Sequence, residues 1–361
     1  MQITKLELIN YRNHKNLSME FAENTTLIIG GNGSGKTNII EAINMLSTGK
    51  GFKASFDREV INYKEKSSTI KGNITRETND DTLKKEIKMG ILIQKDQDES
   101  NKSIKTAKIN GKPLKIGNLS NSFNTVLFSP LEMNLLVNGP SKRRDFLDTI
   151  LFQRDDAYKK DLSNFTKVRR QRNKILETLR EKGSGYAQLK FWNEKLIQHG
   201  KSLQEKRKQF FEYINDHIND VIKKIDPNIE TKVKYLINPA LEEKLVLYQQ
   251  KEIFAGATLV GPHRDDFIFT SKEYGETQDF SKFASRGQQR TLILALKLCE
   301  LSYLEQRIGE KPVLLLDDIF SELDEKHQMA LKNVIGEQQT IITSASENTS
   351  QLGKNIYIHR L

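Results

Sequence analysis

The chain has 361 residues, of which 37% are hydrophobic and 29% are charged, and its formal net charge is +10 at pH 7. These values exclude an intrinsically disordered protein, and the longest apolar runs, such as Val313 to Leu316, are too short to cross a bilayer. The single cysteine, Cys299, excludes an intrachain disulfide, and the first residues lack the basic and apolar regions of a secretory signal. A cytoplasmic protein is therefore expected.

The N-terminal residues predict two strands, a glycine-rich loop and a helix. Apolar and polar residues alternate from Ile3 to Leu8, and Thr26 to Ile29 is a short β-favouring run. Residues 30–37 then read GGNGSGKT, which matches the phosphate-binding pattern G-x-x-x-x-G-K-[ST]. Apolar residues return at helical spacing from Ile39 to Leu46. The motif requires a strand before it and a helix after it, whereas a chance glycine-rich turn would lack both.

This loop predicts binding of ATP and Mg²⁺. Glycines let backbone N–H groups approach phosphates without a clash from Cβ, and the following helix presents its positive end. Lys36 is expected to reach the β- and γ-phosphates, and the hydroxyl of Thr37 is expected to bind Mg²⁺. The other residues predicted to contact the nucleotide here are Gly30, Gly31, Asn32, Gly33, Ser34 and Gly35.

The stretch 57–127 predicts several short strands. Asn110-Gly111, flanked by Lys108-Ile109 and Lys112-Pro113, is typical of a two-residue hairpin turn. Residues 80–103 are rich in charge and predict an excursion at the surface.

The middle of the chain predicts two long helices that carry most of the positive charge. Apolar residues recur at helical spacing on both sides of Gly183, and Pro227 ends the pattern. Residues 141–225 contain 21 Lys/Arg and 12 Asp/Glu. A polyanion partner and a solvated helical face both explain this charge, and sequence alone leaves them open.

Two further segments have the form of nucleotide-binding elements. Ser285-Arg286-Gly287-Gln288 precedes a largely apolar helix, so Ser285 is either a simple N-cap or part of a second phosphate site. One nucleotide does not need two such sites in one chain, but two chains placed head to tail would use both. Val313–Leu316 predicts a buried strand that ends in two carboxylates. Asp317 is expected to bind Mg²⁺ and Asp318 to orient or deprotonate the attacking water, unless Asp318 only caps the next helix.

Together these motifs resemble the ABC-type ATPase head of SMC-like proteins, and in detail the RecF family. The resemblance runs through almost the whole chain. Its motifs are Asn10–His14, Asn32–Asn38, Gly49–Lys53, Gly139–Asp148, Gly261–Asp266, Ser285–Gln288 and Asp317–Asp324. By this resemblance Arg12 and Asn38 are nucleotide contacts, unless Arg12 is a surface arginine.

The resemblance implies an α/β fold: a P-loop ATPase head with mixed sheets and an inserted helical lobe. The expected parts are residues 1–140 (first half of the head), 141–225 (basic lobe) and 226–361 (second half). RecF-like proteins dimerise with ATP, bind single-stranded or gapped DNA, hydrolyse ATP slowly and act with RecO and RecR in loading the recombinase. The resemblance therefore implies roles in DNA replication, recombination, repair and the SOS response, and a place at the nucleoid.

The basic segment supplies the candidates for contacts with DNA. They are Lys142, Arg143, Arg144, Lys167, Arg169, Arg170 and Arg172. They cover more than one helical face, so some of them are expected to be only solvated. His263 and Arg264 lie in a Gly-Pro turn and either line a dimer face or pack locally. An ATPase subunit of a membrane transporter is the alternative function.

Three departures from the ABC pattern are visible. Asp318 stands where glutamate is usual, which sets the carboxylate further back and fits slow turnover. Thr343-Ser344 stands where many ABC proteins carry a histidine, so a hydroxyl is the candidate replacement. No glutamine is present near Leu127–Pro130 to complete the metal shell.

Overall fold

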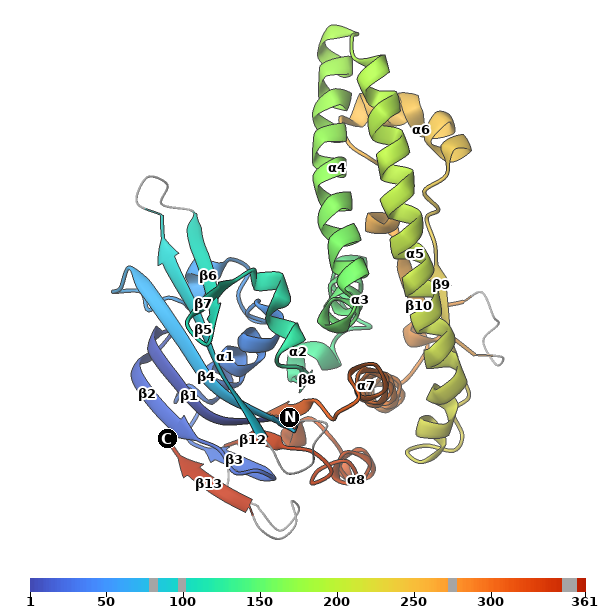
Figure 1. The fold of residues 1–361 in the computed structure, drawn as a ribbon. Coiled ribbons are helices and arrows are strands. Elements are labelled where there is room, and N and C mark those ends of the chain that lie inside the picture. The colour runs from blue at the N-terminus through green and yellow to red at the C-terminus, as the bar shows by residue number, and fades with distance from the viewer. Residues whose placement is uncertain (78–83, 97–101, 272–277, 346–355) are drawn as a thin grey trace. The chain divides into compact units, whose positions relative to one another are not determined.

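The computed structural model describes residues 1–77, 84–96, 102–271, 278–345 and 356–361. The chain forms two compact units (Figure 1). The first consists of Met1–Asn134 together with Ile293–Leu361, and the second of Leu135–Leu292. Both ends of the chain therefore build the first unit, and the second unit is an insertion between them.

The first unit contains a six-stranded antiparallel sheet in the order β2-β1-β4-β5-β6-β7. Its strands are β1 (Gln2–Tyr11), β2 (His14–Glu20), β4 (Ser67–Glu77), β5 (Lys84–Lys95), β6 (Ser103–Ile109) and β7 (Lys112–Leu114). The predicted hairpin is confirmed, because Ile109 pairs with Lys112 across Asn110 and Gly111, whose φ angles are 49° and 79°. Both turn residues are left-handed, as a type I′ turn requires.

The interpretation of residues 80–103 as a surface excursion is wrong for β5. This strand pairs with β4 on one side and with β6 on the other. Ile87, Met89, Ile91 and Ile93 are buried at every second position, while the even-numbered positions of the strand, Lys88 among them, are exposed or only partly buried. One face of a half-buried strand is polar, so its high charge was compatible with a strand. Residues 80–83 and 97–101 lie outside the described residues.

A second sheet of the first unit is parallel, in the order β13-β3-β12-β11-β8. Its strands are β3 (Thr25–Ile29), β8 (Thr125–Phe128), β11 (Val313–Asp317), β12 (Thr340–Ser344) and β13 (Ile356–Arg360). Helix α1 (Lys36–Thr48) contacts strands of both sheets and is buried along most of its length. Gly72 allows this close packing, because a Cβ there would lie 2.5 Å from Cδ1 of Leu46. The remaining helices of this part are α2 (Pro130–Met133) and α8 (Glu325–Lys332).

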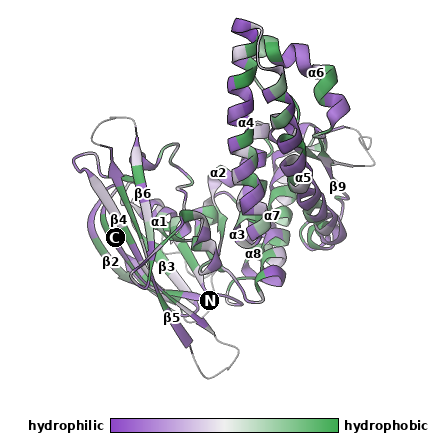
Figure 2. Ribbon diagram, turned by 45° about the horizontal axis from the view of Figure 1, so that its top comes forward, coloured by the Kyte–Doolittle hydropathy of each residue, from purple (hydrophilic) through white to green (hydrophobic). Residues whose placement is uncertain are grey.

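The second unit is built around the two long helices predicted from the sequence, α4 (Asp156–Lys182) and α5 (Tyr186–Lys223). Helix α4 ends at Gly183, which has a left-handed φ of 67°. Figure 2 shows hydrophobic and hydrophilic residues alternating along both helices, and the apolar positions that include Phe165, Leu176 and Leu203 are buried. The other elements are α3 (Pro140–Arg154), β9 (Lys232–Leu236), α6 (Glu242–Ala255) and β10 (Asp266–Thr270).

The structure extends the helical lobe beyond the predicted range of 141–225. Strand β9 pairs with β10 and contacts α5, and α6 contacts α4, so residues as far as Leu292 belong to this unit. A buried ion pair between Arg172 and Glu252 attaches α6 to α4. The periodicity of apolar residues within each helix cannot reveal such a contact. Helix α7 (Arg286–Ile308) begins in residues of the second unit and ends in residues of the first.

Candidate nucleotide-binding site

The glycine-rich loop connects β3 to α1, as its motif requires. Gly33 and Gly35 have φ angles of 83° and 104°, which residues with a Cβ rarely adopt. A Cβ on Gly35 would also lie 2.4 Å from Nε2 of His14, whereas one on Gly31 or Gly33 would meet nothing within 4 Å. The loop is therefore closed toward the protein and open on its other side. This is the shape expected of a cradle for phosphates.

Lys36 lies with its ammonium group at the mouth of this loop. Its Nζ donates hydrogen bonds to the carbonyl oxygens of Gly30 (2.6 Å) and Gly31 (3.0 Å), and the side chain is buried. The Oγ of Ser34 is buried in the same loop and has no hydrogen-bond partner among the described residues. A lysine held at the loop and an orphaned hydroxyl fit the binding of a phosphate chain.

Asp317 closes the site from the neighbouring part of the sheet. It ends β11, and its Oδ1 accepts hydrogen bonds from the hydroxyls of Thr37 and Thr343, each at 2.9 Å. Burial raises the pKa of Asp317, and the bonds from Thr343 and Thr37 oppose that shift. The sequence places Thr37 and Asp317 280 residues apart, and the structure joins their oxygens directly. Two adjacent hard oxygen donors fit the shell of Mg²⁺, which substrate phosphates and water complete.

Asp318 has an unusual backbone conformation. Its φ is 48° and its ψ is 28°, in the left-handed region that a non-glycine residue adopts at a cost. Its N–H donates to Oγ1 of Thr343 at 2.9 Å. Within the described part of the chain its own carboxylate makes no hydrogen bond or ion pair, and the residue is half-buried. The carboxylate is therefore available to a water molecule, as a general base must be.

Arg12, a predicted phosphate contact, is bonded to a buried carboxylate. Its Nε and one terminal nitrogen donate to the two oxygens of Glu41, at 2.5 Å and 2.9 Å. Glu41 is fully buried and also accepts from the N–H of Lys53 at 2.9 Å. The positive charge of Lys53 opposes the rise that burial causes in the pKa of Asp317, so this lysine lies close to the site. The motif Gly49–Lys53 is visible in the sequence, but nothing in it identifies Lys53 as a residue of the site.

The Ser285 segment forms a capping box at the start of α7. Ser285 Oγ accepts from the N–H of Gln288 at 3.2 Å, and Oε1 of Gln288 accepts from the N–H of Ser285 at 2.8 Å. Ser285 and Arg286 are exposed, and Gly287 is half-buried. The capping role is therefore confirmed, and the start of the helix remains open to an approaching anion.

Two of the residues predicted to contact DNA are structural instead. Arg172 is fully buried, with one terminal nitrogen 2.5 Å from Oε2 of Glu252, and Arg143 donates two hydrogen bonds to Asp266 at 2.6 Å and 2.7 Å. The prediction of DNA contacts is wrong for both, because a buried and paired guanidinium cannot reach a phosphate. Lys142, Lys167 and Arg170 are exposed, and Arg144 and Arg169 are half-buried.

Four arginines of the second unit lie close together: Arg144, Arg169, Arg170 and Arg264. Burial and the positive charges of Arg264, Arg144 and Arg170 lower the pKa of Arg169. No described carboxylate forms an ion pair with Arg169, Arg170 or Arg264, and a terminal nitrogen of Arg144 donates to the backbone oxygen of Asp265. We call these residues the arginine cluster. Like charges held together without acids are typical of a site for a polyanion.

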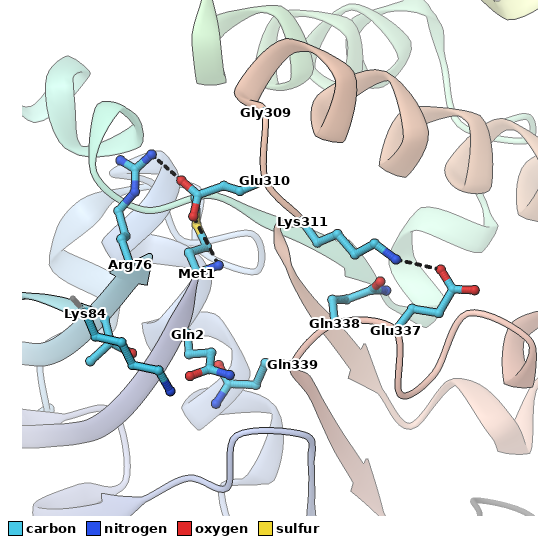
Figure 3. Close-up of a pocket in the computed structure, with 11 residues that line it drawn as sticks. Met1, Gln2, Arg76, Lys84, Gly309, Glu310, Lys311, Glu337, Gln338 and Gln339 are labelled. Atoms are coloured by element: carbon cyan, nitrogen blue, oxygen red, sulfur yellow. Dashed lines mark hydrogen bonds and ion pairs between the residues drawn. The ribbon is translucent and has the colours of Figure 1, made fainter. Parts of the chain in front are cut away.

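A separate hollow of about 260 Å³ lies in the first unit, at the amino ends of the parallel strands (Figure 3). Glu310 and Lys311 precede β11, and Gln338 precedes β12, whereas Lys36 and Asp317 lie at the carboxyl ends. Its charges are paired: Glu310 with Arg76, and Lys311 with Glu337 at 2.8 Å. Ligands of parallel sheets bind beyond the carboxyl ends of the strands, so this hollow is not the nucleotide site.

The cysteine, the tryptophan and His263 all pack against other groups of the protein. Cys299 is buried, and Trp192 contacts the ring of Phe191. His263 is half-buried, and its Nε2 donates a hydrogen bond to the backbone oxygen of Thr258 (2.9 Å). Among the helices in the described ranges, none combines the length and apolar character needed to span a bilayer.

Comparison with known proteins identifies similar sequences along nearly the full length. The model of the RecF/RecN/SMC N-terminal domain matches residues 2–359. A DNA replication and repair protein RecF of Lachnospira eligens is 38% identical over 350 residues, which cover 95% of this chain and 92% of the relative. The protein of the same name from Bacillus cytotoxicus is 34% identical over 363 residues, covering 96% and 92%.

Solved structures give the same result. The ATP complex of the recombination mediator protein RecF in the RecFOR pathway is similar with a TM-score of 0.86 and 31% identity, covering 96% of this chain and 92% of that one. An Smc head bound to the C-terminal winged-helix domain of ScpA has a TM-score of 0.53 at 16% identity, covering 99% and 94%. The second likeness concerns the fold alone. Together they confirm the predicted α/β ATPase head with mixed sheets.

Proposed function

This chain belongs to the RecF family, and we propose that it binds ATP between two copies of itself and grips DNA while the nucleotide is bound. ATP binding and hydrolysis follow from the family and the phosphate loop. The observation that carries the proposal is the pair formed by Thr37 and Asp317, because it joins the loop to the carboxyl end of β11. The membrane-transporter alternative has no support, since the relatives are DNA replication and repair proteins.

Different residues of the site would bind the phosphates, hold the metal and activate the attacking water. Backbone N–H groups of residues 30–35 and the ammonium of Lys36 bind the phosphates, and Lys36 exchanges its two carbonyl contacts for phosphate oxygens. Thr37 and Asp317 would hold Mg²⁺, which when bound neutralises charge on the β- and γ-phosphates. Asp318 orients a water molecule and accepts its proton, from further back than a glutamate would. Slow, DNA-dependent hydrolysis is part of this proposal.

The second half of the site comes, in this proposal, from a partner chain. The helix start at Ser285 is capped, exposed and carries Arg286 beside it. Because Ser285 Oγ accepts the capping bond, its O–H remains able to donate to a phosphate. Backbone N–H groups at the start of α7 add the positive end of a helix dipole. These features suit the γ-phosphate bound in another copy, as in a head-to-tail dimer.

Ser285 variants test this arrangement. Ser285→Asp keeps a capping side chain but places a carboxylate against the partner's γ-phosphate, whereas Ser285→Asn caps without charge. We expect Ser285→Asp to lose ATP-driven dimerisation in sedimentation and to lose hydrolysis, and Ser285→Asn to keep both. Mixed with Lys36→Ala, Ser285→Asp should regain dimers, because each mixed dimer has one intact site. Equal dimerisation and hydrolysis by the Asp and Asn variants would exclude the head-to-tail site.

We further propose that the arginine cluster binds the DNA backbone, with Lys142 and Lys167 as additional candidates. The cluster contains Arg144, Arg169 and Arg170 of the predicted set and adds Arg264, which no motif identified as a DNA contact. Guanidinium groups without carboxylate partners suit phosphate oxygens. Recognition of single-stranded or gapped DNA, joint action with RecO and RecR, and a location at the nucleoid of the cytoplasm complete the proposal. The joint action with RecO and RecR rests on the RecFOR pathway named for the similar ATP-bound structure. The DNA preference and the location rest on the resemblance to the RecF family.

A further inference from the structure

Thr343 is the only side chain among the described residues that bonds both to Asp317 and to the backbone of Asp318. It lies on β12 directly beside Asp317 of β11 in the sheet register. Its Oγ1 donates to Oδ1 of Asp317 and accepts from the N–H of Asp318, both at 2.9 Å. The residue is 1% exposed, so its hydroxyl has no access to water as an alternative partner.

We infer that Thr343 is a positioning residue for hydrolysis, which orients the carboxylate of Asp317 and holds Asp318 in its left-handed conformation. A hydroxyl has one hydrogen and can donate and accept at once. Here the donated bond fixes one oxygen of Asp317, and the accepted bond fixes the peptide that leads to Asp318. This assigns a role to the hydroxyl that stands where many ABC proteins carry a histidine.

The backbone of Asp318 shows why such a hold is needed. Its φ of 48° costs free energy for a residue with a Cβ. One hydrogen bond to a buried acceptor is strong enough to offset this cost. Without the bond, the peptide is free to relax to a negative φ, which would move the Asp318 carboxylate away from its place beyond the sheet.

Thr37 cannot replace Thr343 in this role. Both hydroxyls donate to the same oxygen of Asp317, but the oxygen of Thr37 is also the predicted ligand of the metal. Thr343 belongs to the sheet and carries no predicted ligand role. The two threonines therefore differ in function although they have a common acceptor.

The test compares Thr343→Val, which keeps the shape and removes the hydroxyl, with Thr343→Ser, which keeps the hydroxyl. Thr340→Val is the matched control, because Thr340 is fully buried on the same strand and its hydroxyl donates to the backbone oxygen of Gln338 (3.1 Å), away from Asp317 and Asp318. Three quantities are measured: hydrogen exchange of the Asp318 amide in the nucleotide-free protein, affinity for a fluorescent ATP analogue, and kcat for ATP.

We expect Thr343→Val to exchange the Asp318 amide faster, by roughly five-fold or more for the loss of one bond. We also expect its kcat to fall by at least about ten-fold while nucleotide affinity changes little. Thr343→Ser and Thr340→Val should stay near wild type in all three quantities. Unchanged exchange or unchanged kcat in Thr343→Val would overturn the inference, as would an equal fall of kcat in Thr343→Ser or Thr340→Val.

The inference rests on the proposed nucleotide site, and the measurements separate the two. Loss of ATP affinity in Lys36→Ala supports the nucleotide site whatever Thr343 does. If wild-type protein bound no ATP, the proposed site would fail, and the exchange of the Asp318 amide would still decide whether Thr343 holds that backbone.

Discussion

His263 lies close enough to three members of the arginine cluster for their positive charges to affect its pKa. Burial lowers its pKa to about 4, and the charges of Arg169, Arg264 and Arg144 act in the same direction. Its Nδ1 is buried without a partner among the described residues, so a proton added there would find no acceptor. The imidazole is therefore neutral at pH 7, and its titration reports on the charge of the cluster.

We predict two consequences for His263. In the folded protein it gains a proton near pH 4, whereas the unfolded chain gains it near the ordinary value of 6.5, so stability falls as pH decreases from 6.5 to 4. His263→Gln should make the free energy of unfolding depend less on pH between 6.5 and 4, measured by urea unfolding at several pH values.

Bound oligonucleotide should raise the pKa of His263 in an NMR titration, since phosphates neutralise the arginines. A pKa that stays constant at saturating DNA would place the DNA elsewhere.

At the residue scale, the sequence predicted the nucleotide site better than the DNA contacts. The phosphate loop and Asp317 were identifiable because their spacing and residue types are fixed by the chemistry of phosphate and metal binding. Arg143 and Arg172 were assigned wrongly, because a basic residue in a basic segment has the same appearance whether it is buried or exposed. Their partners, Asp266 and Glu252, are far away in the sequence, and only the fold brings them together.

At the scale of elements, α6 is attached to α4 by a buried ion pair. Arg172 and Glu252 both have 0% side-chain exposure, and Arg172 also bonds to Oγ1 of Thr258 at 3.0 Å and Oδ1 of Asn193 at 2.7 Å. Removal of one partner leaves the other buried and charged without compensation. Arg172→Met should therefore lower the free energy of unfolding by about 3–5 kcal/mol.

The double variant Arg172→Met/Glu252→Met provides the comparison. It leaves no uncompensated charge, so we expect it to recover a large part of the stability lost in Arg172→Met, as measured by denaturant unfolding. Arg170→Met, on the exposed side of the same helix, should change stability by less than about 0.5 kcal/mol and should weaken DNA binding instead. Equal destabilisation by Arg170→Met and Arg172→Met would contradict this division.

Local patterns predicted the elements that are governed by local physics. The 3.6-residue period and the glycine that ends α4 indicated both long helices, and Asn110-Gly111 indicated the hairpin. Strand β5 was missed because four of its first five residues, Lys84, Lys85, Glu86 and Lys88, are charged. The extent of the second unit was also missed, since it depends on pairing between β9 and β10 and on packing of α6, which join segments distant in the sequence.

At the scale of the whole molecule, DNA affinity should depend strongly on salt. Each phosphate that the protein neutralises contributes a slope of about −0.7 to −0.9 to the plot of log affinity against log salt concentration. A dimer that presents two arginine clusters, and neutralises six or more phosphates, should bind about 10³-fold or more weakly at moderate salt than at low salt. Arg264→Gln should make the slope shallower by roughly one for each phosphate that the variant no longer neutralises. Fluorescence anisotropy with a labelled gapped duplex measures the affinity of wild type and Arg264→Gln at each salt concentration. A wild-type slope near zero would contradict recognition of the DNA backbone.

The strand order of the parallel sheet has a consequence for the folding of this protein during its synthesis on the ribosome. Among the described strands, the two that pair with β3, which leads into the phosphate loop, are β12 and β13, and both lie within residues 340–361. The inserted helical unit is translated earlier and has all of its own partners by Leu292. The second unit of a nascent chain can therefore fold while β3, which leads into the phosphate loop, still has no neighbouring strand. Premature termination between Leu292 and β12 would therefore leave a protein that has the complete arginine cluster but lacks the strands that support the phosphate loop.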